Sequence, residues 1–201
     1  MRLIFVRHGQ TIYNVELRYQ GHTDSELSEL GRQQAIKVAE RLRDEDVAAV
    51  YSSDLRRAGE TAEIIARFHG LPVEADDLLR ECAFGDWEGL TVAEIRDAYP
   101  ELYQSYLEDS VKHRAPNGER LESLVQRVGE AVDRIVGRHP DDIVVIVGHG
   151  GTIHAFICHA LGASLYSFRK IRLDNCSVTV FSLDADGRWL LEALNDTCHL
   201  E

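Results

Sequence analysis

The chain has 201 residues, of which 44% are hydrophobic and 28% are charged, and its formal net charge is −12. This length and composition are typical of one globular domain, so we expect a single domain over residues 1–201. The acidic balance argues against nucleic acid or an anionic membrane surface as the main partner, although a local cluster of cationic side chains can still bind a small anion.

No apolar run approaches the ~20 residues that a membrane-spanning helix needs. The chain enters a strand pattern at its N-terminus, without the basic and apolar regions of a secretory signal. The cysteines are widely spaced and form no Cys-x-x-Cys pair, which is typical of reduced cysteines. We therefore expect a cytoplasmic protein, and the sequence leaves a homodimer open.

The first predicted element is a short strand that ends in a cation and an imidazole. Residues 3–6 are continuously apolar, which indicates a strand buried on both faces, and Arg7-His8-Gly9 follows directly. Ligands of open α/β sheets bind at the carboxyl ends of such strands. Taken alone, Arg7 and His8 are equally compatible with a strand-end ion pair and with a functional site.

Helices and strands alternate along the rest of the chain. Further strands are predicted at about residues 47–51, 71–75, 143–147, 178–183 and 188–194, and helices at about 11–17, 28–42, 55–69, 92–99, 101–109, 121–136 and 152–161. This order predicts an α/β fold, a three-layer α/β/α sandwich with a mostly parallel sheet. Asp186-Gly187 between the last two strands indicates a C-terminal hairpin that makes the sheet mixed.

Three of the predicted buried strands end in the same kind of polar turn. The turns are Arg7-His8-Gly9, then Ser52-Ser53-Asp54 with Arg56 and Arg57 at the following helix, and Gly148-His149-Gly150-Gly151. Parallel strands place all three turns at one edge of the sheet. Helix N-termini, glycine N–H groups and arginines are the groups that bind phosphate, so a phosphate is the predicted ligand.

Two histidines beside a bound phosphate favour phosphoryl transfer. A neutral imidazole can attack phosphorus and form a phosphohistidine, while a protonated one stabilises charge on the transferring group. A carboxylic acid can protonate the leaving alcohol. Because no magnesium motif is apparent, arginine and histidine would neutralise the charge, and we expect no metal and no cofactor.

The motifs together resemble the histidine phosphatase superfamily, the phosphoglycerate-mutase-like group, over nearly the whole chain. The residues that carry the resemblance are Arg7-His8-Gly9-Gln10-Thr11 with Asn14, Ser52 to Ala58 with Thr61-Ala62, Glu81 ahead of Phe84-Gly85-x-Trp87-Glu88-Gly89, and Gly148-His149-Gly150. Each motif is moderately specific alone, and their occurrence in this order is highly specific.

The resemblance implies a role for each matching position. It implies that His8 is the phosphorylated nucleophile, that Glu81 is the proton donor, and that the remaining residues bind the phosphate or border it. These are Arg7, Arg56 and His149 lining the pocket, Asn14 and the Gly150 backbone on phosphate oxygens, Gln20 and Gly21 on a loop that closes on the substrate, and Thr11 as a hydroxyl near the phosphate.

For several residues near these motifs, a structural role is favoured over a catalytic or ligand-binding one. With Arg56 at the motif position, Arg57 is interpreted as a surface or salt-bridging residue. Glu88 competes with Glu81 for the acid role but is interpreted as a structural residue at a helix start. His149, His154 and His159 are spaced by five residues and so share no helix face as zinc ligands would, which favours ordinary helical histidines.

The family contains phosphatases and mutases, and the segment after Glu81 distinguishes them best. Residues 99–117 are compact here, with Lys112 and Arg114 as their only basic residues, whereas mutases of the phosphoglycerate type carry a longer insertion. We predict a metal-independent phosphomonoester hydrolase acting on a small phosphorylated metabolite. The chain is similar to short phosphatases of the family, including those acting on α-ribazole phosphate.

The alternative is a cofactor-dependent phosphoglycerate mutase. A catalytically silent phosphate-binding module ranks below both, because His8, Arg56, Glu81 and His149 are all present.

Overall fold

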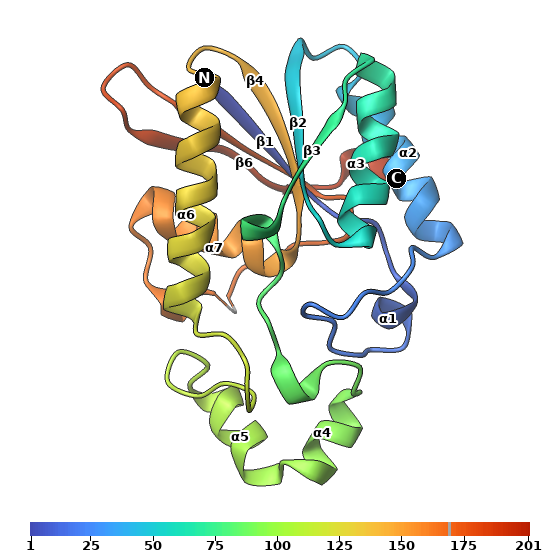
Figure 1. Ribbon diagram of the computed structural model, residues 1–201, viewed down its shortest axis with the longest axis vertical. Helices are drawn as coiled ribbons and strands as arrows, with labels where there is room; N and C mark the ends of the chain where they lie inside the picture. Colours follow the sequence, from blue (N-terminus) through green and yellow to red (C-terminus); the bar gives the residue numbers. More distant parts are fainter. Residues whose placement is uncertain (169) are drawn as a thin grey trace.

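The computed structural model describes residues 1–168 and 170–201. A six-stranded sheet forms its centre, with the strands in the order β3-β2-β4-β1-β5-β6 (Figure 1). The strands are β1 (Arg2–Arg7), β2 (Val47–Ser53), β3 (Val73–Asp76), β4 (Ile143–Gly148), β5 (Val178–Leu183) and β6 (Trp189–Asp196). The first four are parallel, while β5 is antiparallel to β1 and β6 to β5. The predicted mixed, mostly parallel sheet is confirmed.

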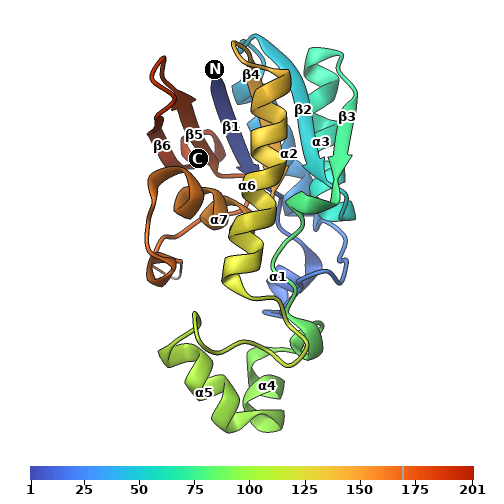
Figure 2. The same cartoon turned by 60° about the vertical axis from the view of Figure 1, so that its left-hand side comes forward.

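Helices cover both faces of the sheet, as the three-layer prediction requires. Helices α2 (Glu29–Leu42) and α3 (Arg56–His69) lie on one face, and α6 (Leu121–Arg138) and α7 (Gly150–Leu161) lie on the other (Figures 1 and 2). The shorter helices are α1 (Ile12–Val15), α4 (Val92–Ala98) and α5 (Pro100–Glu108), with 3-10 turns η1 (Asp77–Leu79), η2 (Gly85–Trp87), η3 (Leu165–Ser167) and η4 (Cys198–Leu200). Within the described residues, no helix is both long and apolar enough to span a membrane.

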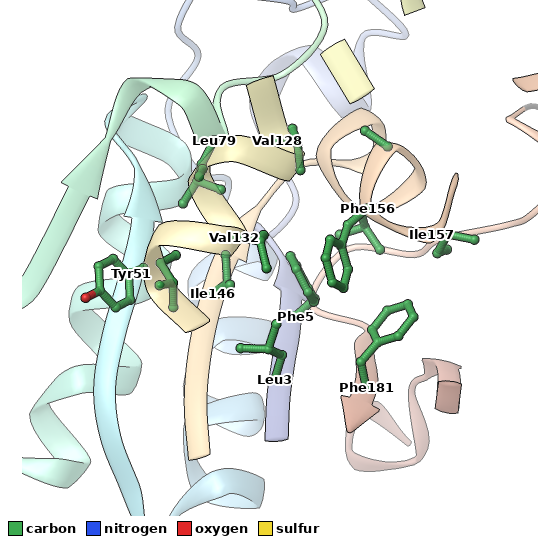
Figure 3. Packing of buried hydrophobic residues seen from close by; sticks show 14 of the residues in the cluster. Leu3, Phe5, Tyr51, Leu79, Val128, Val132, Ile146, Phe156, Ile157 and Phe181 are labelled. Carbon is green, nitrogen blue, oxygen red and sulfur yellow. The ribbon is translucent and has the colours of Figure 1, made fainter. Parts of the chain in front are cut away.

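Strand β1 lies in the middle of the sheet because both of its faces are apolar. Leu3 and Phe5 pack under α6 and α7, and Ile4 and Val6 pack under α2 and α3. Figure 3 shows Phe5 against the Phe156 ring, with the ring centroids 4.8 Å apart. Full burial of each such side chain contributes about 1.5–3 kcal/mol, and a slip of one residue would exchange the two faces. The core therefore fixes where β1 ends.

Register then determines which polar residues meet at the sheet edge. Arg7 at the end of β1 pairs with Gly148 at the end of parallel β4. The next residues along the two strands, His8 and His149, are consequently neighbours at the same edge. The sheet thus brings together two histidines that are far apart in the sequence.

Most predicted boundaries agree with the local capping signals. Ser28 caps α2 by accepting from Gly31 N, Thr91 and Glu94 form a capping box on α4, and Gly162 ends α7 in the left-handed conformation. Among the boundaries that differ, β2 was predicted to end at residue 51 but continues to Ser53, because Ser52 and Ser53 pair with β3.

A separate lobe lies beyond the carboxyl ends of the parallel strands. It contains α4 and α5, and Figures 1 and 2 show it below the sheet, reached through residues 78–90. Its own small core consists of Trp87, Ile95, Tyr103 and Ala115. The lobe therefore faces the sheet edge at which the polar turns gather.

Candidate active site

His8 lies at the end of β1 and is 3% exposed. Its Nδ1 is 2.8 Å from the Gly9 carbonyl oxygen, which can only accept, so Nδ1 carries the proton. The Nε2 atom is then left with its lone pair in the neutral ring. Burial, together with the nearby Arg57 and Arg7 guanidinium groups, holds the pKa of His8 well below its ordinary value. The ring is therefore a neutral imidazole with a fixed tautomer at neutral pH.

His149 caps α7 directly beside His8. The two ring centroids are 5.1 Å apart and the ring planes are inclined by 60°. His149 is fully buried, and neither ring nitrogen has a hydrogen-bond partner in the described part of the chain. Burial lowers its pKa, and the neighbouring Arg57 lowers it further. An imidazole buried without partners is costly, which indicates that its nitrogens serve a ligand at this site.

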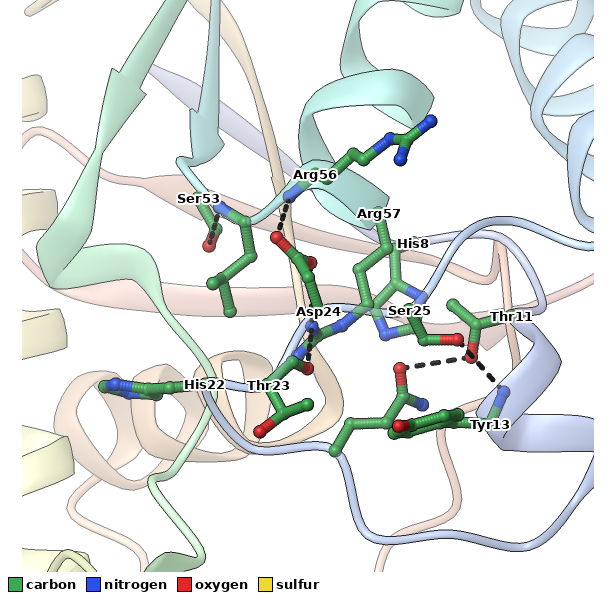
Figure 4. Close-up of polar contacts among 12 residues, drawn as sticks. His8, Thr11, Tyr13, His22, Thr23, Asp24, Ser25, Ser53, Arg56 and Arg57 are labelled. Carbon is green, nitrogen blue, oxygen red and sulfur yellow. Dashed lines mark hydrogen bonds and ion pairs between the residues drawn. The ribbon is translucent and has the colours of Figure 1, made fainter. Parts of the chain in front are cut away.

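The arginine supplied by α3 is Arg57, which corrects the assignment made from the motif. Arg57 has no exposed side-chain surface, whereas the Arg56 side chain is 60% exposed and its Nη1 donates to Glu26 at 2.8 Å. Figure 4 shows Arg57 next to His8 and Arg56 extending away from it. Helix α3 begins at Arg56, and its second residue, Arg57, faces inward in phase with buried Thr61. Arg57 was interpreted as a surface or salt-bridging residue: it is not at the surface, but it does pair with Asp24, with Nη1 3.3 Å from Oδ1.

Arg57 also holds the loop before α2. Its Nη2 donates to Gly21 O at 2.7 Å, and its Nη1 donates to Thr23 O at 3.1 Å. Its Nε is buried without a partner in the described part of the chain, as is Nε of Arg7. Arg7 in turn donates to the Leu173 carbonyl. Both guanidinium groups are thus anchored at one end and keep a donor for the site.

The predicted phosphate-binding residues fall into two groups. Asn14, Gln20 and Gly21 line a cavity of about 290 Å³ together with Arg7, His8, Arg57 and Glu81. Thr11 does not line it: its buried hydroxyl accepts from Asn14 N and donates to Gln20 Oε1. The predicted contact of Thr11 with phosphate is therefore replaced by contacts to two of the residues that line the cavity.

Glu81 lines the same cavity as His8 and also lines a second, larger cavity. Its Oε1 accepts from Cys82 N at 2.8 Å and its Oε2 from Gly151 N at 3.2 Å, so the start of α7 orients the carboxylate. A Cβ on Gly151 would lie 1.9 Å from Glu81 Oε1, so any side chain at position 151 would displace the Glu81 carboxylate. Gly150 lies alongside, where a Cβ would be 4.0 Å from Glu81 Oε2.

Glu88 is less suited to the acid role than Glu81, because Glu81 lines both cavities and Glu88 is not among the residues that line them. Glu88 accepts from the backbone N–H groups of His22, Thr23 and Phe84. Glu88 follows η2 rather than starting a helix as expected, but its role is structural. His22 extends past it and contacts the Glu81 carbonyl at 3.0 Å.

The larger cavity has a volume of about 410 Å³ and lies between the sheet edge and the lobe. Apolar side chains such as Phe84, Tyr106 and Ile171 line it, and its lining includes the cationic residues Arg7, Lys112, Arg114, Arg120 and Arg172. It shares Arg7, Glu81 and Phe84 with the smaller cavity. A ligand can therefore occupy both cavities, with Glu81 beside the junction.

Sequence reasoning did not single out Arg127, which supports Glu81. Arg127 Nη2 donates to the Glu81 carbonyl at 2.9 Å and Nη1 to the carbonyls of Leu78 and Arg80. Its charge is balanced by Glu119. Arg127 lies in an amphipathic helix, in which a charged residue is expected. No signal in the sequence therefore distinguished it from other charged residues of the helix.

The remaining α7 histidines have structural partners. His154 has both ring nitrogens engaged, with the carbonyls of Gly150 and Ile171, and His159 lies against Asp133. Within the described residues, no group of three or more histidine, cysteine, aspartate or glutamate side chains is arranged to hold a metal ion.

Comparisons with known proteins agree over the full length. Residues 3–197 match the family model of the histidine phosphatase superfamily, branch 1. The chain is 40% identical over 203 residues to phosphoglycerate mutase-like protein 4 of Arabidopsis thaliana, covering 99% of this chain and 86% of that protein. It is 36% identical over 200 residues to phosphoserine phosphatase 1 of Hydrogenobacter thermophilus, covering 100% and 94%.

A solved structure shares the same fold. YhfR of Bacillus stearothermophilus superposes with a TM-score of 0.94 at 36% sequence identity, covering 100% of this chain and 99% of that one. Both the motifs and the arrangement of the elements thus lead to one group of proteins.

Proposed function

The chain belongs to the histidine phosphatase superfamily, and we propose from this premise that it hydrolyses small phosphate monoesters through a phosphohistidine on His8. The observation that carries the proposal is the contact of His8 Nδ1 with its neighbouring carbonyl, since it leaves Nε2 as the nucleophile. Phosphate would lie in the smaller cavity, against Arg7, Arg57 and Asn14. The start of α7 adds the positive end of a helix dipole.

The reaction would proceed in two displacements. His8 Nε2 attacks phosphorus, the bond from phosphorus to the ester oxygen breaks, and protonated Glu81 gives its proton to the leaving alcohol. A water molecule then attacks the phosphohistidine and gives its proton to the Glu81 carboxylate. The P–N bond breaks and inorganic phosphate and neutral His8 are released. Arginine and histidine neutralise the phosphoryl charge, so we expect chelators to leave the activity unchanged.

The larger cavity would hold the alcohol part of the substrate. Its Arg114 and Arg120 side chains have no ion pair within residues 1–168 and 170–201, although the whole chain carries a net charge of −12. An alcohol with its own acidic group would supply the missing charge. We therefore propose a small phosphorylated acid as the preferred substrate, rather than an uncharged or cationic ester.

Substrate pairs that differ in one carboxylate test this preference. 3-Phosphoglycerate is compared with glycerol 3-phosphate, and O-phosphoserine with phosphoethanolamine, by phosphate release. We expect the carboxylated member of each pair to have the higher kcat/KM. Equal values within both pairs would contradict the substrate proposal while leaving the phosphatase proposal intact.

Detection of the phosphorylated enzyme tests the assignment of His8 as the nucleophile. Acid-labile, base-stable label from a ³²P-phosphate ester should appear on the wild-type protein and on the control His159→Gln, and be lost in His8→Ala together with turnover of p-nitrophenyl phosphate. Label on His8→Ala would overturn the assignment.

A mutase is the second candidate, supported by the identity to the Arabidopsis mutase-like protein. Isomerisation of 3-phosphoglycerate that depends on 2,3-bisphosphoglycerate would establish it. Phosphate release without isomerisation would support the phosphatase.

We also place the protein in the cytoplasm, a proposal supported by its four free cysteines, Cys82, Cys158, Cys176 and Cys198.

A further inference from the structure

Asn175, which belongs to no predicted motif, contacts two residues of the site at once. It lies just before β5, and its amide nitrogen Nδ2 is 3.0 Å from the His8 carbonyl oxygen and 3.3 Å from Asn14 Oδ1. We infer that Asn175 is a positioning residue that fixes the Asn14 amide so that its NH₂ group faces the phosphoryl oxygens. The inference rests on the proposed function, in which Asn14 binds phosphate.

Groups with only one hydrogen-bonding role fix the polarity of these contacts. The His8 carbonyl can only accept, so the Asn175 atom facing it is Nδ2. The Thr11 N–H can only donate, so the Asn14 atom 3.1 Å from it is Oδ1. That same oxygen receives Asn175 Nδ2. The NH₂ group of Asn14 is therefore the end left for the cavity that Asn14 lines.

Asn14 is held from two sides by parts of the chain that are far apart in the sequence. Thr11 holds it from within its own turn, as the N-cap of α1. Asn175 holds it from the segment that precedes β5. With Asn175 removed, one donor to Oδ1 remains, and the amide is free to turn its oxygen towards the phosphate. An amide oxygen repels a phosphoryl oxygen, so a reversed amide weakens phosphate binding.

The effect of Asn175 passes through Asn14 rather than through the nucleophile. The His8 N–H donates to Gly148 O at 2.9 Å, and Cys176 N, which donates to Arg7 O at 2.9 Å, also lies 3.4 Å from the His8 carbonyl oxygen. The backbone of His8 is thus held without Asn175. A change at Asn175 should consequently depend on which residue occupies position 14.

Inorganic phosphate is the probe, with its Kd measured by calorimetry and its Ki measured against p-nitrophenyl phosphate. We expect Asn175→Ala to weaken phosphate binding about tenfold and to raise KM more than it lowers kcat. The Asn175→Asp variant should bind phosphate more weakly still, because a carboxylate accepts from the Asn14 NH₂ group and turns the Asn14 oxygen towards the ligand. Binding of phosphate by Asn175→Asp at the wild-type level would overturn the inference.

A double-mutant cycle separates positioning from a general loss of structure. In an Asn14→Ala background, Asn175→Ala should change the phosphate Kd by less than about twofold. Multiplicative effects of the two changes would contradict the inference. Ser177→Ala is the matched control, because this buried hydroxyl in the same loop has no partner in the described part of the chain. It should bind phosphate like the wild type.

The thermal stability of each variant is measured, and Asn175→Ser replaces Asn175→Ala in the cycle if the alanine variant unfolds at the assay temperature.

The proposal for His8 as nucleophile and the inference about Asn175 can fail separately. Turnover by His8→Ala would remove the proposed nucleophile but leave the phosphate-binding cycle valid. A wild-type protein that hydrolyses esters while Asn175→Ala binds phosphate normally would remove only the inference about Asn175.

Discussion

The two adjoining cavities are built in different ways. The smaller cavity lies at the end of β1, and its side chains His8 and Arg57 are buried, with buried His149 at the end of the paired strand β4 beside His8. The larger cavity is lined mainly by irregular segments and by exposed cations such as Arg114 and Arg120. Rigid strand ends suit a reacting group that must be placed accurately, whereas exposed side chains suit recognition of a variable alcohol.

Replacing each of the two adjacent arginines, Arg56 and Arg57, by methionine should show the largest difference in kcat/KM. Arg57→Met should lower kcat/KM for p-nitrophenyl phosphate by about a hundredfold or more, because a buried charge on the phosphoryl group is lost. Arg56→Met, on the exposed side of the same helix turn, should change it by less than about twofold. Steady-state kinetics with thermal melts measures both. Equal losses would contradict the burial-based assignment.

Removing the proton of Glu81 should have a smaller and selective effect. Glu81→Gln keeps the shape of the side chain and an acceptor for Gly151 N, but cannot protonate the alcohol. Turnover of alkyl phosphates should fall about a hundredfold, and that of p-nitrophenyl phosphate, whose leaving group is stable without a proton, only a few-fold. The ratio of the two rates is the measurement. A uniform loss would argue against Glu81 as the acid.

In the larger cavity the expected effects are modest. Arg114→Gln and Arg120→Gln should each reduce kcat/KM for carboxylated substrates by about threefold to fivefold, as expected for exposed charges, and leave glycerol 3-phosphate unaffected. Raising the salt concentration should diminish the difference. Arg67→Gln, remote on α3, is the charge-matched control. If this control reduced the rates equally, net charge alone would explain the effect.

The smallest effect is a shift in titration. A neighbouring cation disfavours the imidazolium, so Arg57→Met should raise the pKa of His8, as followed by NMR of the ring.

In the wild type, His8 and His149 have folded-state pKa values below the ordinary 6.5, so the unfolded state binds protons first as the pH falls. Their stabilising contribution is fully present above that value and is lost as the pH falls towards the folded-state pKa. Melting temperatures between pH ~8 and ~5 would record this loss, and a flat profile would contradict it.

Much of the fold could be predicted because local signals and packing agree. The apolar run before Arg7 indicates a buried strand and the Asp186-Gly187 turn indicates a hairpin, and the structure contains both. Parallel pairing then made the meeting of His8 and His149 predictable, since strand ends at one edge are neighbours whatever their separation in sequence.

The arginine assignment failed although the signal for it was present. Arg57, Thr61 and Ile65 are four residues apart and form part of the buried helix face, which periodicity alone would have indicated. Motif position was given more weight than helix phase. Asn175 and Arg127 could not have been found in this way, because they act through contacts made across more than forty residues of chain.

Arg7, Glu81 and Phe84 line both cavities, and this has a consequence for engineering the substrate specificity. Because few side chains border both cavities, a mutant library confined to residues 106–121 would alter the alcohol that fits while leaving the nucleophile and its phosphate ligands untouched. New specificities should then be reachable through gradual changes that each retain activity. The same separation means that selection for speed on one substrate and selection for a new substrate would enrich variants in different parts of the gene.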